Sequence, residues 1–191
     1  MDQGMARELL GLPLGKRLLL FGALNVTDKR KGIDYLIEAL RRMEKQDVEL
    51  VVFGQVKDDI RGLFPVPIHS MGYLSDESKI VALYNAVDMF ITSSLEENLP
   101  NTIMESMACG TPCVGFEIGG IPEMIDHRVN GYVANYKDAG DLANGIQWVL
   151  EHEDRLALSD ACVKKVQENY TEEVVAKQYM ALYKHLLHQK K

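Results

Sequence analysis

The feature that most constrains the fold of this chain is the alternation of short apolar runs with longer amphipathic segments. Six runs have the composition of strands, at 17–23, 48–54, 66–72, 88–94, 112–116 and 131–135. Several are nearly all apolar, as strands covered on both faces must be. Between them, residues 32–45 and 77–87 carry apolar side chains at helical spacing. With right-handed crossovers, this pattern predicts a single α/β domain: a Rossmann-like, doubly wound, mostly parallel six-stranded sheet with helices on both faces.

Size and composition narrow the function classes. A chain of 191 residues fits one domain. Its net charge of −7 argues against a general nucleic-acid surface, which is normally basic. No apolar run approaches the ~20 residues of a membrane helix, and the start lacks the apolar core of a secretory signal. The 3 cysteines lack paired spacing, which disfavours disulfides and zinc. These observations predict a soluble, cytoplasmic protein.

The loops after the strands are the expected functional region, because doubly wound sheets bind ligands at the carboxyl ends of their strands, where strand order reverses. The first strand is expected to end at Gly22. Lys29, Arg30 and Lys31 then lead into a helix at Gly32. Three cations there suit a diphosphate, although most surface charge runs are only solvated. The loop is neither a Walker loop nor a GxGxxG fingerprint, which disfavours NTPases and dinucleotide oxidoreductases.

Two glutamates, Glu97 and Glu105, lie in SSLEENLPNTIMESMACG, where a strand is expected to become a helix. A carboxylate accepts hydrogen bonds from two hydroxyls at once, so sugars and riboses are natural partners. Pro100 suits an early helical position, and the amides around Asn101 to Ile103 would be free to meet a phosphate. Spacing alone leaves Glu105 equally open to a capping or helix-dipole role.

Two further loops are candidates. After the third strand, the backbone at Gly72 and Tyr73 can contact a base edge, or Tyr73 can simply pack, and Ser75 is expected to cap the next helix. After the fifth strand, Gly119 and Gly120 allow a ligand to approach the backbone, or form a tight turn. The sequence alone leaves both pairs of alternatives open.

Together these segments resemble the carboxyl-terminal, donor-binding domain of retaining GT-B glycosyltransferases of the group one type. The resemblance rests on FGALNVTDKRKGIDYLIEAL, on VVFG, on MGYLSDESKIVALYNAVDMFITSSLEENLPNTIMESMACGTPCVGFEIGGIPEMI and on a closing YTEEVVAKQYMALYKHLL helix. Glu97 to Glu105 fits the Glu-x7-Glu motif of that family. The resemblance implies that 1–191 is one donor domain, with 152–191 as C-terminal helices, and that an N-terminal acceptor domain is absent.

The resemblance also implies a role for each matched residue. Glu97 would contact hydroxyls of the transferred sugar, Glu105 would bond the ribose, and Lys31 would neutralise the leaving diphosphate. Amides of Asn98 and Leu99 would face the sugar, and amides of Thr102 and Ile103 the phosphate. The other implied donor-binding residues are Arg30, Gly22, Ala23, Gly72, Tyr73, Gly119 and Gly120.

One position departs from the family pattern. Many relatives have an arginine directly after the glycine of the first strand, where this chain has Ala23. Our hypothesis is that Arg30 compensates, because it is the neighbour of Lys31.

The implied activity is transfer of a hexose from a UDP- or GDP-type nucleotide diphosphate sugar to an acceptor hydroxyl in glycan synthesis, with retained configuration and without a metal or cofactor. The isolated domain would be inactive, would bind no nucleic acid, and would meet membranes only through the absent domain. It would expose apolar side chains that face that domain, at Tyr179, Leu182 and Leu186. Two alternatives remain: a nucleotide-sugar binding module without transferase activity, and a fragment of a nucleotide-sugar epimerase.

Overall fold

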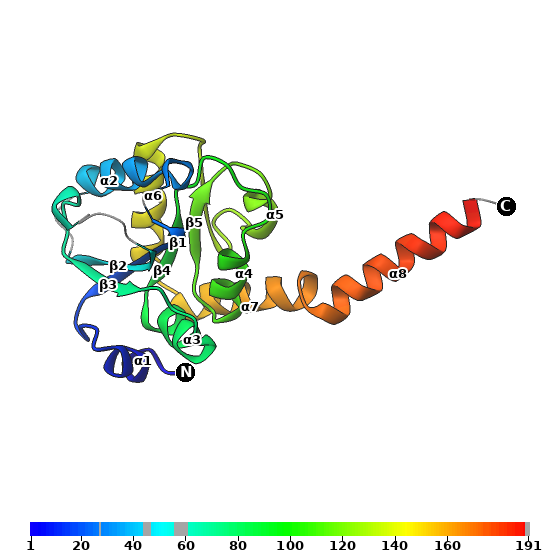
Figure 1. The fold of residues 1–191 in the computed structure, drawn as a ribbon, viewed down its shortest axis with the longest axis horizontal. Coiled ribbons are helices and arrows are strands. Elements are labelled where there is room, and N and C mark those ends of the chain that lie inside the picture. Colours follow the sequence, from blue (N-terminus) through cyan, green and yellow to red (C-terminus); the bar gives the residue numbers. More distant parts are fainter. Residues whose placement is uncertain (27, 44–46, 56–60, 190–191) are drawn as a thin grey trace.

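A parallel sheet between two layers of helices forms the body of the protein (Figure 1). The computed structural model describes residues 1–26, 28–43, 47–55 and 61–189. The strands are β1 (Arg17–Asn25), β2 (Val48–Gln55), β3 (Ile68–Gly72), β4 (Met89–Thr92), β5 (Cys113–Phe116) and β6 (Gly131–Ala134). Their order is β3-β2-β1-β4-β5-β6, and each neighbouring pair is parallel. The predicted doubly wound α/β fold is confirmed.

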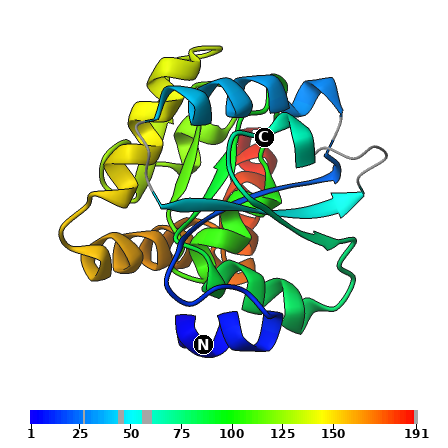
Figure 2. The same ribbon diagram turned by 90° about the vertical axis from the view of Figure 1, so that its left-hand side faces the viewer.

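Helices cover both faces of this sheet, as Figure 2 shows from the side. The helices and turns are α1 (Gln3–Leu10), η1 (Lys29–Lys31), α2 (Ile33–Arg42), η2 (Arg61–Leu63), α3 (Glu77–Ala86), α4 (Asn101–Ala108), α5 (Ile121–Met124), α6 (Ala139–Leu150), α7 (Arg155–Asn169) and α8 (Glu172–Gln189). One apolar cluster joins α2 and α6 to the sheet, and a second joins α1, α3, α4, α5 and α7 to its other face.

The strand order reverses between β1 and β4. The chain builds β1, β2 and β3 outward to one edge, then α3 carries it back to place β4 beside β1, with Phe21 opposite Ile91. The loops that follow β1 and β4 therefore leave the sheet side by side at its carboxyl edge. This is the switch point at which such sheets form ligand crevices.

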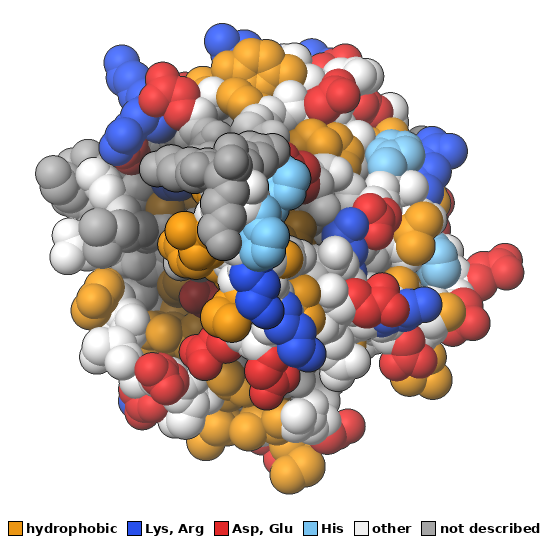
Figure 3. Space-filling model, turned by 90° about the vertical axis from the view of Figure 1, so that its right-hand side faces the viewer, with side chains coloured by type: hydrophobic (Ala, Val, Ile, Leu, Met, Phe, Trp, Pro, Cys, Tyr) orange, Lys and Arg blue, Asp and Glu red, His pale blue; other side chains and the backbone are white. Residues whose placement is uncertain are grey.

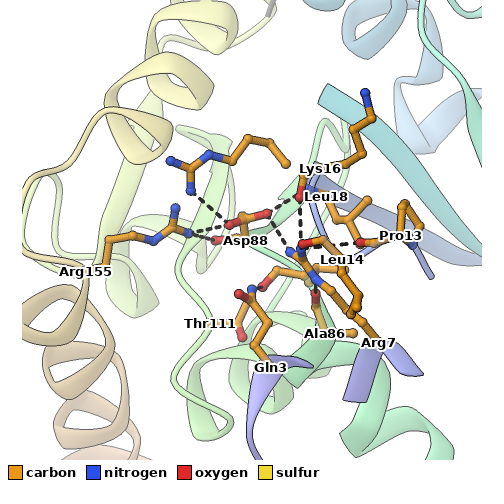
Figure 4. Close-up of polar contacts among 12 residues, drawn as sticks. Gln3, Arg7, Pro13, Leu14, Lys16, Leu18, Ala86, Asp88, Thr111 and Arg155 are labelled. Atoms are coloured by element: carbon orange, nitrogen blue, oxygen red, sulfur yellow. Dashed lines mark hydrogen bonds and ion pairs between the residues drawn. The ribbon is translucent and has the colours of Figure 1, made fainter. Parts of the chain in front are cut away.

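A buried carboxylate organises the opposite edge of the sheet, where the strands begin (Figure 4). Asp88, immediately before β4, is 4% exposed and its Oδ2 accepts from Arg7 at 3.0 Å and from the Leu18 amide at 2.7 Å. Its Oδ1 accepts from Arg155 at 2.8 Å and Arg17 at 3.4 Å. One side chain thus joins α1, β1, β4 and α7.

Arg7 extends this network to backbone carbonyls. Arg7 is 4% exposed, and its guanidinium donates to Ala86 O at 2.7 Å, Lys16 O at 2.9 Å and Leu14 O at 3.0 Å. Figure 4 shows these carbonyls grouped around the arginine. A buried guanidinium is tolerated only when its donors are satisfied, and here the acceptors come from α3 and from the segment between α1 and β1.

Two local expectations were wrong. β1 does not end at Gly22: it continues to Asn25 after a register shift, and a Cβ at Gly22 would lie 2.0 Å from the Phe53 ring. Gly22 therefore gives space to an aromatic ring inside the sheet. Ser75 does not cap α3, because Asp76 occupies that position and accepts from the Ser78 amide.

Helix α8 projects away from the body (Figure 1). The predicted exposure of its apolar side chains is confirmed, with Tyr179 56%, Leu182 50% and Leu186 48% exposed. Figure 3 shows the side toward which α8 projects, with hydrophobic side chains on its surface. In the described part of the chain, no helix has both the length and the apolar character needed to cross a membrane.

The Asp88 network generates a stability prediction. Asp88→Asn removes the charge that Arg7 and Arg155 share while keeping the shape of the side chain. Because breaking a buried ion pair leaves uncompensated charge, we expect the free energy of unfolding to fall by about 3 kcal/mol or more. Urea denaturation followed by circular dichroism measures this loss.

The matched control is Asp47→Asn. Asp47 also pairs with a cation, Lys16, but its side chain is 71% exposed. Exposed pairs contribute about 0–1 kcal/mol, so this variant should unfold almost like the wild type. Equal losses from both variants would show that Asp88 has no special structural role.

Candidate functional site

An open cleft of about 550 Å³ lies at the carboxyl edge of the sheet. The side chains and backbone of three loops form it, those that follow β1, β4 and β5. The residues that line it are Arg30, Lys31, Glu96, Glu97, Asn98 and Ile118. The structure therefore brings together four of the residues expected from the sequence, namely Arg30, Lys31, Glu97 and Asn98.

A charged pair lies in this cleft. Lys31 Nζ donates to Glu97 Oε1, which also accepts from Ser94 Oγ at 2.9 Å. Ser94 Oγ in turn accepts from Thr92 Oγ1 at 3.1 Å, so a short hydroxyl chain leads from β4 to the carboxylate. The Glu97 side chain is 15% exposed. Within the described part of the chain, no hydrogen bond occupies its Oε2, which leaves that oxygen available to a ligand.

Backbone contacts hold the loops that carry this pair. The Leu95 amide donates to Arg30 O at 2.7 Å, and Ser93 Oγ donates to Lys31 O at 2.9 Å. Gly32, directly after Lys31, has φ +62°, and a Cβ there would be 1.9 Å from Ser93 O. Only glycine permits both this conformation and this approach. The position of the Lys31 backbone is thus set by the segment that carries Glu97.

The loop after β5 closes on the same segment. Gly119 has φ +53°, and a Cβ on it would lie 1.9 Å from Glu97 O. Gly120 donates its amide to Asn98 O, and a Cβ there would be 2.5 Å from that oxygen. Both glycines therefore allow a close backbone approach, and the backbone that they approach is that of Glu97 and Asn98.

Arg30 is held by a partner that the sequence analysis did not identify. Its guanidinium donates to Asp28 Oδ2 at 2.7 Å and its amide to Asp28 Oδ1 at 2.9 Å. These bonds, the side-chain one first, lower the pKa of Asp28 to about 2. Arg30 therefore reaches the cleft as a cation whose charge is shared with a neighbouring carboxylate.

Glu105 lies outside this cleft. It is in the second turn of α4 and borders a groove of about 340 Å³ between α3 and α4, together with Ile80, Tyr84 and Ala108. Its Oε2 accepts from Tyr84 Oη at 3.0 Å. The structure thus places the two glutamates of the motif in different hollows, Glu97 in the cleft and Glu105 in the groove between α3 and α4.

The start of α4 offers fewer amides than expected. Pro100 is the N-cap, and the Ile103 amide already donates to Pro100 O at 3.1 Å. The Ile103 side chain is fully buried. Of the amides between Asn101 and Ile103, the one at Ile103 therefore has an internal partner. A phosphate-facing role for the Thr102 amide stays a prediction.

The remaining candidates lie outside the residues that line the cleft. Gly72 ends β3 with φ +64°, and Tyr73 after it is 62% exposed. Leu99 is 40% exposed beside Asn98. Ala23 is largely buried within β1. Donor-binding roles for these residues stay predictions.

The hydroxyls that hold the two glutamates were not predicted from the sequence. Ser94, three residues before Glu97, falls in a run of small polar residues whose members look alike in sequence. Tyr84 falls in the apolar stripe of α3, which predicts packing, and the ring does pack while its hydroxyl reaches Glu105. A hydroxyl-bearing residue in a buried stripe is a signal that a polar partner is near, since buried hydroxyls are hydrogen-bonded.

Metal-ligating side chains and thiols are the other groups that could give a site its chemistry. In the ranges that the structure describes, no group of three or more His, Cys, Asp or Glu side chains is placed to hold a metal ion. Cys113 and Cys162 are buried, and Cys109 is partly exposed. Burial raises the pKa of the Cys113 thiol to about 12, so it is not a thiolate at neutral pH.

Comparison with known proteins identifies the family. Residues 15–152 match the family described as glycosyl transferases group 1. The chain belongs to this family. An uncharacterized glycosyltransferase of Methanocaldococcus jannaschii is 29% identical over 188 residues, which are 93% of this chain and 47% of the relative. The N-acetyl-alpha-D-glucosaminyl L-malate synthase of Bacillus anthracis is 30% identical over 112 residues, 58% of this chain and 29% of the relative.

Solved structures share the fold of this group 1 glycosyltransferase chain. Sucrose-phosphate synthase from Thermosynechococcus elongatus has a TM-score of 0.80 at 25% identity, with 98% of this chain and 50% of that one covered. Anabaena HepE, in complex with UDP and glucose, has a TM-score of 0.77 at 22% identity, with coverage of 96% and 52%. The chain thus spans about half the length of these relatives, and the expected match to the carboxyl-terminal half of GT-B glycosyltransferases is confirmed.

The contact between Gly119 and Glu97 generates a prediction. Gly119→Ala forces a Cβ against the Glu97 carbonyl and places alanine in the left-handed region, which costs about 1–2 kcal/mol by itself. We expect the overlap to add about 1–3 kcal/mol, because the neighbouring backbone has to move. Thermal unfolding by calorimetry measures the sum.

Gly11→Ala is the control. Gly11 has φ +66°, and a Cβ added there would have nothing within 4 Å, so the substitution carries the conformational cost without the overlap. The melting temperature of Gly119→Ala should be clearly the lower of the two. Identical melting temperatures would mean that the loop yields freely and does not hold the Glu97 segment.

Proposed function

We propose that this chain is the donor-binding half of a retaining glycosyltransferase, which moves a hexose from a UDP- or GDP-type nucleotide diphosphate sugar to an acceptor hydroxyl in glycan synthesis. The observation that carries the proposal is the Lys31–Glu97 pair in an open cleft at the switch point of the sheet. A cation beside a carboxylate complements a ligand in which phosphate is followed by hydroxyls.

In this proposal Lys31 and Arg30 neutralise the diphosphate, and Arg30 supplies the charge that Ala23 lacks. Both cations line the cleft. Negative charge develops on the diphosphate as the sugar leaves, so cations already fixed in place stabilise the transition state without reorganising. The backbone bonds from Leu95 and Ser93 support this preorganisation, because they fix the loop on which both cations lie.

Glu97 is proposed to accept hydrogen bonds from hydroxyls of the transferred sugar, with its Oε2 toward the ligand. The amides of Asn98 and Leu99 would face the same sugar. Ser94 supports this role, because its bond to Oε1 sets the direction of the carboxylate. Positioning of this kind contributes to rate by holding the reacting bond in the productive geometry.

The nucleotide is proposed to lie along the start of α4. Glu105 would bond the ribose, the Thr102 amide would face the phosphate, and the loop at Gly72 and Tyr73 would hold the base. The complexes of HepE with UDP and with UDP-glucose are consistent with a nucleotide of this kind in the shared fold.

Residues 1–191 are proposed as one donor domain, with 152–191 as its C-terminal helices. The chain spans about half the length of its relatives, and an acceptor site would be supplied by a second domain. We therefore expect donor binding without sugar transfer from this chain alone.

The experiment is isothermal calorimetry with UDP, GDP and their glucose or mannose forms. Glu105→Ala should weaken nucleotide and nucleotide sugar alike, by about 10- to 100-fold, as expected for a lost hydrogen bond to a charged group worth ~1.5–3 kcal/mol. Glu97→Ala should not weaken the binding of free nucleotide, and it should remove the preference for the nucleotide sugar.

Glu168→Ala, an exposed change on α7, is the control and should bind like the wild type. Two results would contradict the proposal. One is the absence of binding to any of these ligands at millimolar concentration, and the other is an equal loss of both affinities from Glu97→Ala and Glu105→Ala.

A further inference from the structure

A tyrosine of the core contacts Glu105, the second glutamate of the Glu-x7-Glu motif. Tyr84, near the end of α3, is 1% exposed, and its hydroxyl donates to Glu105 Oε2 at 3.0 Å. Glu105 itself is on the surface of α4. A buried residue on one helix thus sets the position of an exposed carboxylate on the next.

The tyrosine is held from several sides. Its ring lies edge-on to Phe53, with 6.2 Å between centroids, and to Phe90, at 6.0 Å. Its backbone carbonyl accepts from Thr111 Oγ1 at 2.7 Å. Edge-to-face aromatic pairs have a preferred geometry, so the hydroxyl cannot swing away without disturbing β2 and β4. The phenol is a rigid anchor.

The direction of the hydrogen bond is also fixed. Burial first, and the neighbouring Glu105 second, raise the pKa of Tyr84 far above its usual range. The Tyr84 hydroxyl therefore keeps its proton and is the donor of the hydrogen bond to Glu105 Oε2. Such charge-assisted bonds are stronger than bonds between neutral groups.

We propose that Tyr84 is a positioning residue that gives the domain its preference for ribonucleotides over deoxyribonucleotides. It binds Glu105 Oε2 and turns Oε1, which has no hydrogen bond within the described part of the chain, toward a ribose hydroxyl. This inference rests on the proposed function, in which Glu105 binds the ribose. Without the Tyr84 hydroxyl, the Glu105 carboxylate samples other rotamers, and the ribose hydroxyl loses its fixed acceptor.

A purely structural role makes a different prediction. If the hydrogen bond to Glu105 only satisfies the buried Tyr84 hydroxyl, removal of this hydroxyl lowers stability. It then leaves the ratio of affinities for ribose and deoxyribose nucleotides unchanged. That ratio is therefore the decisive quantity. Stability alone cannot distinguish the two roles.

The variant is Tyr84→Phe, which keeps the ring and its contacts with Phe53 and Phe90. Calorimetry compares the dissociation constants of UDP, 2′-deoxy-UDP and 3′-deoxy-UDP, or of the guanosine series if the wild type binds GDP more tightly. The wild type should prefer the ribonucleotide over at least one deoxy form. In Tyr84→Phe this preference should fall by about tenfold, chiefly through weaker binding of the ribonucleotide.

Tyr132→Phe is a matched control. Tyr132 is 5% exposed and its hydroxyl also donates to a carboxylate, Asp141 Oδ1 at 2.8 Å, but it lies on β6. It should lose stability comparably and keep the ribose preference. Adding Tyr84→Phe to Glu105→Ala should cause no further loss of preference, because the anchored group is already gone.

The outcomes separate the two proposals. If the wild type binds neither UDP nor GDP, the proposed function fails and this inference fails with it. If the wild type binds a ribonucleotide with preference and Tyr84→Phe retains that preference, the inference is overturned while the proposed function stands. A wild type that binds UDP and its deoxy forms equally would also overturn it.

Discussion

The rest of this structure depends on one buried carboxylate, Asp88. It accepts from arginines of α1, β1 and α7 and from the amide of Leu18, and so fixes where β4 begins. A strand rises about 3.3 Å per residue and is stiff over so short a length. Since β4 spans only Met89–Thr92, an anchor immediately before it also determines where the following loop leaves the sheet. The network at one edge thereby supports the cleft at the other.

Backbone contacts hold the loops of the cleft in place, and these loops position the charged side chains. Carbonyls of Arg30, Lys31 and Glu97 meet an amide, a hydroxyl and a glycine from neighbouring loops. Each of these contacts joins segments far apart in the sequence, so the three loops behave as one surface. Because the loops are held in place, the Lys31 and Glu97 side chains lie close enough to form their ion pair. An ion pair on mobile loops would contribute little, because ordering long side chains costs entropy.

The strand and helix pattern predicted the layers, the parallel sheet and the carboxyl-edge cleft, because apolar periodicity is local and right-handed crossovers leave few topologies. It placed Lys31 and Glu97 in loops at the same edge of the sheet, and the ion pair between them is a finding of the structure. It did not predict Tyr84 beneath Glu105 or Arg7 beside Asp88. These contacts join separate elements whose rotation about their own axes is decided by packing. The error at Gly22 has the same origin: the aromatic ring that fills its place belongs to another strand.

The pairing of Lys31 with Glu97 links the two ends of a bound ligand. Each of these charges has the other as its partner within the protein, so a phosphate that draws the ammonium toward itself removes one donor from the carboxylate. Ser94 remains, but it occupies the same oxygen. A ligand that also brings hydroxyls to Glu97 restores what the phosphate removed. In the proposed function, sugar and diphosphate therefore bind with positive cooperativity although they share a single molecule, and either fragment alone binds more weakly than its own contacts would suggest.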